Sequence, residues 1–157
     1  MIKISIPGFK NIEIKNILLD YNGTIATDGI PINGIIEKFE IISKSAKIHV
    51  ITADTHGTVQ KKLKNYNCEI VVISGKNQDV LKLEYLEKIG KNHSAAIGNG
   101  LNDRLMIQNA ALGIAVLGIE GAHSKTILNS DLIVSSANDA LDLFIKTNRL
   151  IAGLRNE

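Results

Sequence analysis

The sequence is poor in several residue types, and each shortage excludes a class of protein. There is no Trp and few other aromatic residues, so Ile, Leu, Val and Ala must fill the core. Cys68 is the single cysteine, which excludes an internal disulfide and favours a reducing compartment. A net charge of +2 on 157 residues is too weak to indicate a protein that binds nucleic acid.

Long apolar runs are also missing from the chain. No stretch approaches the roughly 18 apolar residues that are needed to cross a bilayer. Residues 1–6 alternate apolar and polar side chains, which differs from the apolar block of a signal peptide. We therefore expect a cytoplasmic protein that acts on neither nucleic acid nor membranes.

Strand and helix periods alternate along the sequence. Residues 2–14 alternate on either side of a Pro-Gly turn and predict a β-hairpin. Further strands are predicted at 17–20, 49–52, 70–73, 95–97, 114–116 and 132–134. Helices are predicted over 33–45, 55–65, 78–89, 103–110 and 137–152.

Three of these elements carry more detailed expectations. The continuous apolar run 70–73 is typical of a strand that is covered on both faces. The helix 55–65 is expected to be capped by Asp54 or Thr55. The helix 78–89 is expected to be strongly amphipathic and to end at Gly90, with an apolar side formed by Leu81, Tyr85, Leu86 and Ile89.

The alternation predicts one α/β domain over residues 1–157, because parallel strands need crossover helices between them. We expect a Rossmann-like three-layer sandwich with a parallel sheet, preceded by the N-terminal hairpin. In open α/β sheets, ligands bind beyond the carboxyl ends of the strands. The residues at those ends are therefore the candidates for chemistry.

Two strand ends carry oxygen-bearing side chains. Asp20 ends a buried strand, where a carboxylate can serve as a nucleophile or a metal ligand. The following Asn22-Gly23 pair is equally common in simple turns. Thr52 ends another strand, where its hydroxyl can bind a phosphate oxygen or cap a turn.

A lysine and a glycine-rich loop follow these two strand ends. Lys82, with Lys76 as the second choice, can neutralise charge on a nucleophile and a phosphate, or can be a solvated helix lysine. The segment 98–103 reads Gly-Asn-Gly-Leu-Asn-Asp. Its Asn99, Asn102 and Asp103 offer the oxygen ligands that Mg²⁺ prefers, although a loop with Asn102 as a helix cap would read similarly.

Together these segments make the chain resemble the haloacid dehalogenase superfamily of phosphatases and phosphotransferases. More narrowly, it is similar to the phosphorylation domain of P-type ATPases. The resemblance rests on 19–24, Thr52, Lys82 and 97–103, and the segments 111–116 and 130–134 match the family's last strands. It spans nearly the whole chain from about residue 17.

The resemblance implies a phosphohydrolase or phosphotransferase that forms an aspartyl-phosphate on Asp20. It implies a Mg²⁺ cofactor and a phosphorylated substrate. The implied metal ligands are Asp20, Asn22 through its main-chain carbonyl, Asn99 and Asp103. The implied catalytic residues are Asp20, Asn22, Thr52 and Lys82, and the implied substrate contacts are Gly23, Thr24, Thr52, Ala53 and Lys82.

Two positions depart from the family pattern. Asn22 stands where family phosphatases carry an Asp that serves as general acid and base, and an amide cannot accept a proton at neutral pH. Asn99 stands where the metal loop has its first acid. We therefore expect weak Mg²⁺ binding and slow dephosphorylation, although attack by an already ionised Asp20 remains feasible. A catalytically silent phosphate-binding regulatory protein is the alternative.

The chain is too short between these motifs for the cap domains that family members insert. We therefore expect a capless, open site. Such a site favours a large substrate, or a cap that is borrowed from another subunit of a homo-oligomer.

Overall fold

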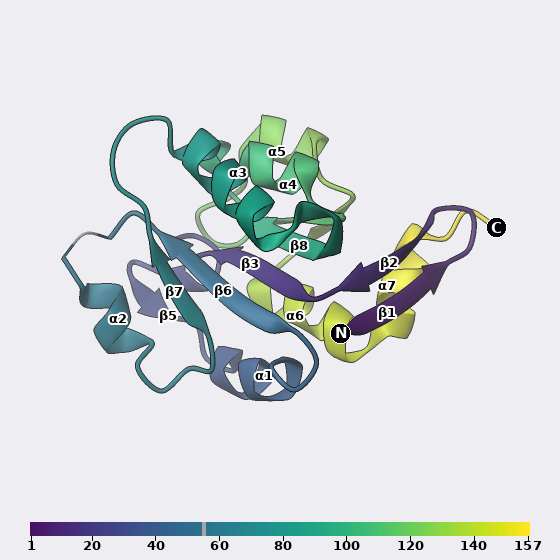
Figure 1. Ribbon diagram of the computed structural model, residues 1–157, viewed down its shortest axis with the longest axis horizontal. Coiled ribbons are helices and arrows are strands. Elements are labelled where there is room, and N and C mark those ends of the chain that lie inside the picture. Colours follow the sequence, from purple (N-terminus) through teal and green to yellow (C-terminus); the bar gives the residue numbers. More distant parts are fainter. Residues whose placement is uncertain (55) are drawn as a thin grey trace.

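The computed structural model describes residues 1–54 and 56–157 and has three layers, with a six-stranded parallel sheet between two groups of helices (Figure 1). The strand order is β10-β9-β8-β3-β6-β7. These strands are β3 (Asn16–Asp20), β6 (Lys47–Thr52), β7 (Glu69–Val72), β8 (Ser94–Gly98), β9 (Leu112–Val116) and β10 (Leu132–Val134). The predicted Rossmann-like α/β sandwich is confirmed.

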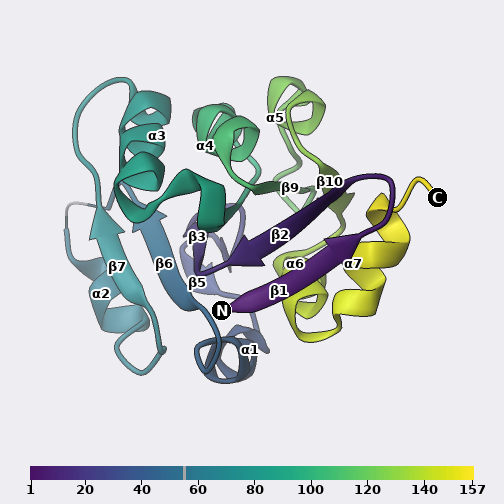
Figure 2. The same cartoon turned by 45° about the vertical axis from the view of Figure 1, so that its right-hand side comes forward.

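Alternate residues of the central strands build a separate core on each face of the sheet. Leu18 faces one core, whereas Ile17 and Leu19 face the other. The first face is covered by α3 (Gln78–Ile89), α4 (Arg104–Asn109) and α5 (Ser124–Leu128), and the second by α1 (Ile35–Ile42), α2 (Thr58–Lys62) and α6 (Ala137–Ile145) (Figure 2). Two short 3-10 helices, η1 (Lys91–His93) and η2 (Leu101–Asp103), flank β8.

The predicted N-terminal hairpin is present. Its strands β1 (Ile2–Ile6) and β2 (Lys10–Ile14) pair antiparallel, with Ile4 opposite Ile12. Figure 1 shows it at one end of the molecule, beside α7 (Thr147–Leu154) and the C-terminus. The buried isoleucines of both strands join the core that also holds α6, so the hairpin extends that core beyond the sheet.

The prediction of one helix over 137–152 is wrong, because α6 and α7 are separate helices. Lys146 interrupts the chain with non-helical angles (φ −114°, ψ 67°). Thr147 and Asn148 follow it, and both residue types favour helix starts over helix interiors. The break lets α7 turn and pack against β1.

A second small hairpin was not predicted. It consists of β4 (Ala26–Thr27) and β5 (Ile30–Pro31) and follows the Asp20 loop directly. Its turn residues Asp28 and Gly29 both have positive φ, at 50° and 72°. An Asp-Gly pair between two strands is a strong signal for this turn, and it could have been recognised in the sequence.

Three other expectations need correction. The run 70–73 belongs to β7, which is an edge strand with Val72 exposed, so it is not covered on both faces. The helix expected over 55–65 is shorter, since α2 covers only 58–62. Helix α3 ends at Gly90 as predicted, but its most buried side chains include Lys82, which weakens its amphipathic character.

Among the residues that the structure describes, the longest helices are short, and none combines the length and apolar character that spanning a bilayer requires.

Candidate active site

The chain changes direction in the sheet between β3 and β8, which opens a crevice at the carboxyl ends of these strands. From β3 it proceeds through β6 to the edge strand β7, and then returns to β8 on the other side of β3. Such a switch point is where open α/β sheets bind ligands. Asp20 ends β3 and Asn99 directly follows β8, so the two residues flank the crevice.

A buried lysine joins the two acidic residues that the sequence singled out. Lys82 reaches down from α3 and is 1% exposed. Its Nζ donates to Oδ1 of Asp20 at 2.6 Å and to Oδ1 of Asp103 at 2.5 Å. Of the two candidate lysines, Lys82 is therefore the one beside Asp20, whereas Lys76 is exposed in the loop before α3.

Asp103 lies behind this lysine and not at the surface of the crevice. It is completely buried. Its second oxygen, Oδ2, accepts hydrogen bonds from the main-chain N–H groups of Asn99 (3.0 Å) and Gly100 (2.9 Å). Both carboxylate oxygens of Asp103 are thus occupied, and its role in the structure is to hold Lys82 and the loop after β8.

The electrostatics of this cluster differ from the expectation that Asp20 is fully ionised. Burial raises the pKa of Asp20 to about 7, and the neighbouring charge of Asp103 acts in the same direction against the opposing effect of Lys82. Burial disfavours the charge of Lys82, but the two carboxylates outweigh this effect and raise its pKa. Lys82 therefore stays protonated, and the raised pKa means that Asp20 holds its proton to a higher pH than a free aspartate does.

The loop after Asp20 folds tightly against the loop after β8. Gly23 has a φ of 79° and donates its N–H to the carbonyl of Ala26 at 2.8 Å. A side chain at Gly23 would collide with Asn99, whose amide atoms lie 2.5 and 2.8 Å from the position of its Cβ. Thr24 is buried and donates to Oδ1 of Asn99 at 3.4 Å, whereas Asn22 is exposed.

Thr52 lies at the end of β6, where a strand end was predicted, and its side chain stabilises the turn that follows. Its hydroxyl oxygen accepts the N–H of Asp54 at 3.1 Å. Asp54 in turn accepts the N–H groups of His56 (2.9 Å) and Val59 (2.8 Å), so it binds the first turn of α2, although the N-cap position itself is taken by Gly57. The alternative cap, Thr55, lies outside the described residues.

A cavity of about 290 Å³ brings most of the predicted residues together. Its lining includes six predicted site residues, namely Asp20, Asn22, Thr52, Ala53, Lys82 and Asn99. Gly23, Thr24 and Asp103 support the wall without lining it. Sequence reasoning missed Gln78 and Glu120, which also line the cavity; Glu120 sits in a loop with no motif to mark it.

The donor set of this cavity fits Mg²⁺ with few protein ligands. Among the metal ligands expected from the sequence, its oxygen donors are the Asp20 carboxylate, the Asn99 amide and the main chain at Asn22. Mg²⁺ in proteins commonly keeps several waters beside one or two carboxylates. Within 1–54 and 56–157, no group of three or more His, Cys, Asp or Glu side chains is arranged to hold a metal. The amide at position 99 thus leaves the site short of negative charge.

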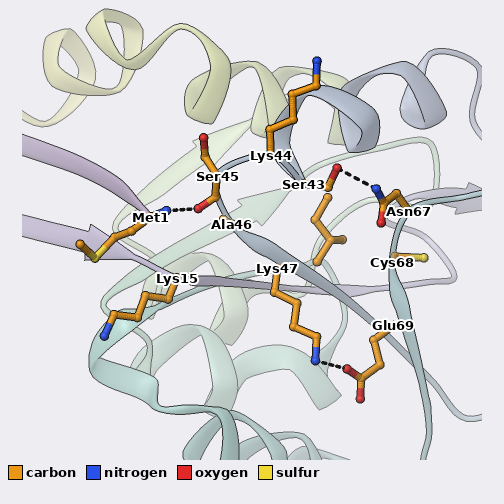
Figure 3. Close-up of a pocket in the computed structure, with 11 residues that line it drawn as sticks. Met1, Lys15, Ser43, Lys44, Ser45, Ala46, Lys47, Asn67, Cys68 and Glu69 are labelled. Carbon is orange, nitrogen blue, oxygen red and sulfur yellow. Dashed lines mark hydrogen bonds and ion pairs between the residues drawn. The ribbon is translucent and has the colours of Figure 1, made fainter.

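A larger hollow of about 660 Å³ lies at the opposite edge of the sheet, where β3, β6 and β7 begin (Figure 3). Its charged groups do not converge: Lys15 and Lys44 point in opposite directions, and Lys47 pairs with Glu69 at 2.5 Å. Burial raises the pKa of the Cys68 thiol to about 11, which disfavours the thiolate that acts as a nucleophile. The smaller cavity at Asp20 is therefore the candidate active site.

Comparison with known sequences identifies relatives without a known activity. No protein-family model matches the chain. The uncharacterized protein MJ0073 of Methanocaldococcus jannaschii is 50% identical over 84 residues, which cover 51% of this chain and 90% of that protein. MJ0072 of the same organism is 51% identical over 39 residues, which cover 25% of this chain and 89% of that protein.

Comparison with solved structures identifies phosphatases of similar fold. The 3-deoxy-D-manno-octulosonate 8-phosphate phosphatase of Moraxella catarrhalis, determined with magnesium and phosphate, is 20% identical, with a TM-score of 0.66 over 88% of this chain and 92% of that one. The cobalt-bound Haemophilus influenzae phosphatase YrbI has a TM-score of 0.72 at 12% identity, covering 87% and 90% of the two chains. A hydrolase assigned to HAD subfamily III A, from Legionella pneumophila, has a TM-score of 0.66 at 17% identity, covering 90% and 87%.

Proposed function

We propose, from the premise that this chain belongs to the same family as MJ0073 and has the fold of the haloacid dehalogenase phosphatases, that it is a Mg²⁺-dependent phosphohydrolase or phosphotransferase. The observation that carries this proposal is the contact of Lys82 with both Asp20 and Asp103 at the carboxyl ends of the strands. It holds a carboxylate nucleophile beside a cation, in a crevice of suitable size for a phosphoryl group.

In the proposed reaction, an oxygen of Asp20 attacks phosphorus while the bond from phosphorus to the leaving oxygen breaks. The product of this step is an aspartyl-phosphate, which water then hydrolyses to release inorganic phosphate and the free carboxylate. The Lys82 ammonium and the Thr52 hydroxyl donate to the oxygens of the transferred group. Ala53 lines the same space, whereas the N–H groups of Gly23 and Thr24 are already bonded to Ala26 and Tyr21 within the loop after Asp20.

The metal would be held by Asp20, the main-chain carbonyl of Asn22 and the Asn99 amide, and would neutralise charge on the phosphoryl oxygens. Asp103 was expected among the ligands. Since both of its oxygens are already occupied, we assign it instead to positioning Lys82.

Turnover is expected to be slow because Asn22 cannot assist the water that hydrolyses the intermediate. The raised pKa of Asp20 adds a second constraint, since only its ionised form attacks phosphorus. Substrates whose leaving oxygen needs no proton, such as acyl and aryl phosphates, should therefore react best. A second hollow of about 370 Å³, lined by Tyr21 and Lys62, adjoins the cavity at Asn22 and Ala53 and offers space for the leaving group.

The enzyme is proposed to have an open crevice and to work in the cytoplasm. A single, capless domain would leave the crevice open, which would suit a macromolecular phosphate or a homo-oligomer whose second subunit covers a small substrate. The lone cysteine, in a partly buried position, is consistent with work in the cytoplasm.

The test is phosphate release and acid-stable ³²P labelling of the protein with Mg²⁺ and a panel of acyl, aryl and alkyl phosphates. Asp20→Asn should abolish both signals, because it removes the nucleophile. The matched control is Asp28→Asn, an exposed turn residue of the β4–β5 hairpin whose left-handed conformation Asn tolerates. Absence of release and labelling in the unaltered protein, combined with phosphate binding, would favour the silent regulatory alternative.

A further inference from the structure

The cavity contains one more carboxylate that the proposed mechanism does not use. Glu120 lies in the loop between β9 and α5, at residues 117–123. It lines the same cavity as Asp20 and Asn99. We propose that Glu120 is the second carboxylate of the divalent-cation site and supplies the negative charge that Asn99 lacks; this inference rests on the proposed function.

The position of Glu120 follows from its approach to the Asp20 loop. Its Oε2 lies 2.7 Å from the point that a Cβ of Gly23 would occupy, and the Asn99 amide borders the same point with Nδ2 at 2.5 Å and Oδ1 at 2.8 Å. The two oxygens thus flank one methyl-sized space directly beside the main chain that follows Asn22. One hydrated Mg²⁺, with its oxygens about 2.0–2.1 Å away, can reach both directly or through a bound water.

Hydrogen bonds hold this loop in place at both ends. On one side, the N–H of Leu117 donates to Val134 at 2.9 Å. On the other, the N–H of His123 donates to the carbonyl of Asn99 at 2.8 Å, and the Asn99 amide donates to the carbonyl of Gly121 at 2.9 Å. Asn99, which lacks a charge, therefore anchors the loop that carries the Glu120 carboxylate.

The charges around the cavity leave Glu120 available for a cation. Lys82 is already shared by Asp20 and Asp103. Within the part of the chain that the structure describes, no side chain forms a hydrogen bond or ion pair with the exposed Glu120 carboxylate. Asp20, paired with Lys82, and the unpaired Glu120 are then the two carboxylates that line one cavity, an arrangement that can bind a divalent cation.

The test is calorimetric titration of the full chain with MgCl₂ at pH 8, with Glu120→Gln, Asp20→Asn and the matched control Glu40→Gln. Glu40 is exposed on α1, far from the cavity. We expect Glu120→Gln to weaken Mg²⁺ binding about tenfold, in line with the loss of one nearby charge at a partly solvated site, whereas Glu40→Gln should leave it unchanged. Thermal melting of each variant reports on folding.

Three outcomes separate this inference from the function on which it rests. If Asp20→Asn abolishes binding while Glu120→Gln matches the unaltered protein, Glu120 is not part of the site and the proposed function stands. If the unaltered protein binds no Mg²⁺ and releases no phosphate, both proposals fail. If Glu120→Gln weakens binding but the protein labels no substrate, the cation site stands and the phosphohydrolase proposal does not.

Discussion

Lys82 and Asp20 are 62 residues apart in the sequence and form a buried ion pair, with Nζ 2.6 Å from Oδ1. The pair joins the middle of α3 to the carboxyl end of the central strand β3. Asp103 contacts the same ammonium group, with Oδ1 2.5 Å from Nζ. The contact therefore serves both the packing of α3 on the sheet and the chemistry of the crevice.

Replacing Lys82 with Met should destabilise the protein strongly. The side chain is of similar size and apolar, but two buried carboxylates would lose their shared cation. Breaking a buried ion pair in this way costs roughly 3–5 kcal/mol of unfolding free energy. Urea denaturation would measure the change, with Lys76→Met as the exposed control, which should stay within about 0.5 kcal/mol. Equal losses in both variants would contradict the structural role of Lys82.

Asn99→Asp should tighten Mg²⁺ binding about tenfold, because it adds a carboxylate at the end of β8 beside Asp20. Calorimetry would measure the dissociation constant. Asn92→Asp adds the same charge in η1, away from the cavity, and should have no effect. An unchanged or weaker affinity in Asn99→Asp would argue that the metal does not approach this loop. Combining Asn99→Asp with Glu120→Gln should recover part of the affinity lost in Glu120→Gln alone.

Asn22→Asp should shorten the life of the aspartyl-phosphate. A carboxylate at this exposed position beside Asp20 can accept the proton of the attacking water, and general-base assistance is typically worth roughly 10²- to 10⁴-fold in rate. Rapid-quench labelling would follow the intermediate, with Asn92→Asp again as the charge control. The variant should also extend the substrate range to alkyl phosphates. Identical lifetimes in both proteins would show that residue 22 is not the missing base.

Protonation of His49 should make the folded protein less stable in mild acid. Burial lowers the pKa of His49 below 6.5. The ring lies between Asn16, 3.2 Å from Nε2, and the Tyr85 hydroxyl, 2.9 Å from Nδ1. Below pH 6.5 the unfolded chain therefore binds a proton that the folded chain resists, so stability falls as the pH decreases through this window.

Urea denaturation between pH 5 and 8 would measure this dependence. One proton limits the contribution of His49 to about 1.4 kcal/mol per pH unit. His49→Asn should reduce the slope below pH 6.5, although the variant is less stable overall. His56→Asn, at an exposed position, should keep the original slope. A slope that is equally steep in the His49 variant would assign the acid sensitivity to other groups.

Local sequence patterns predicted most of the elements and the ends at which the chemistry lies. The runs before Asp20, Thr52 and Gly98 are strands because their apolar residues are short, continuous and bounded by turn residues. The same patterns gave wrong predictions where the place of an element in the fold decides how far its side chains are buried. The run at β7 is as apolar as a central strand, yet its place at the sheet edge leaves Val72 exposed.

What the sequence by itself determined is the parallel α/β architecture and the gathering of Asp20, Thr52 and Asn99 at one edge of the sheet. These features follow from short-range periodicity and from the rule that parallel strands end at the same edge. Only the tertiary structure decided that Lys82 and not Lys76 contacts Asp20, that Asp103 is buried behind that lysine, and that Glu120 enters the cavity. Each of these depends on how distant segments pack through space, and that packing leaves no periodic signal in the chain.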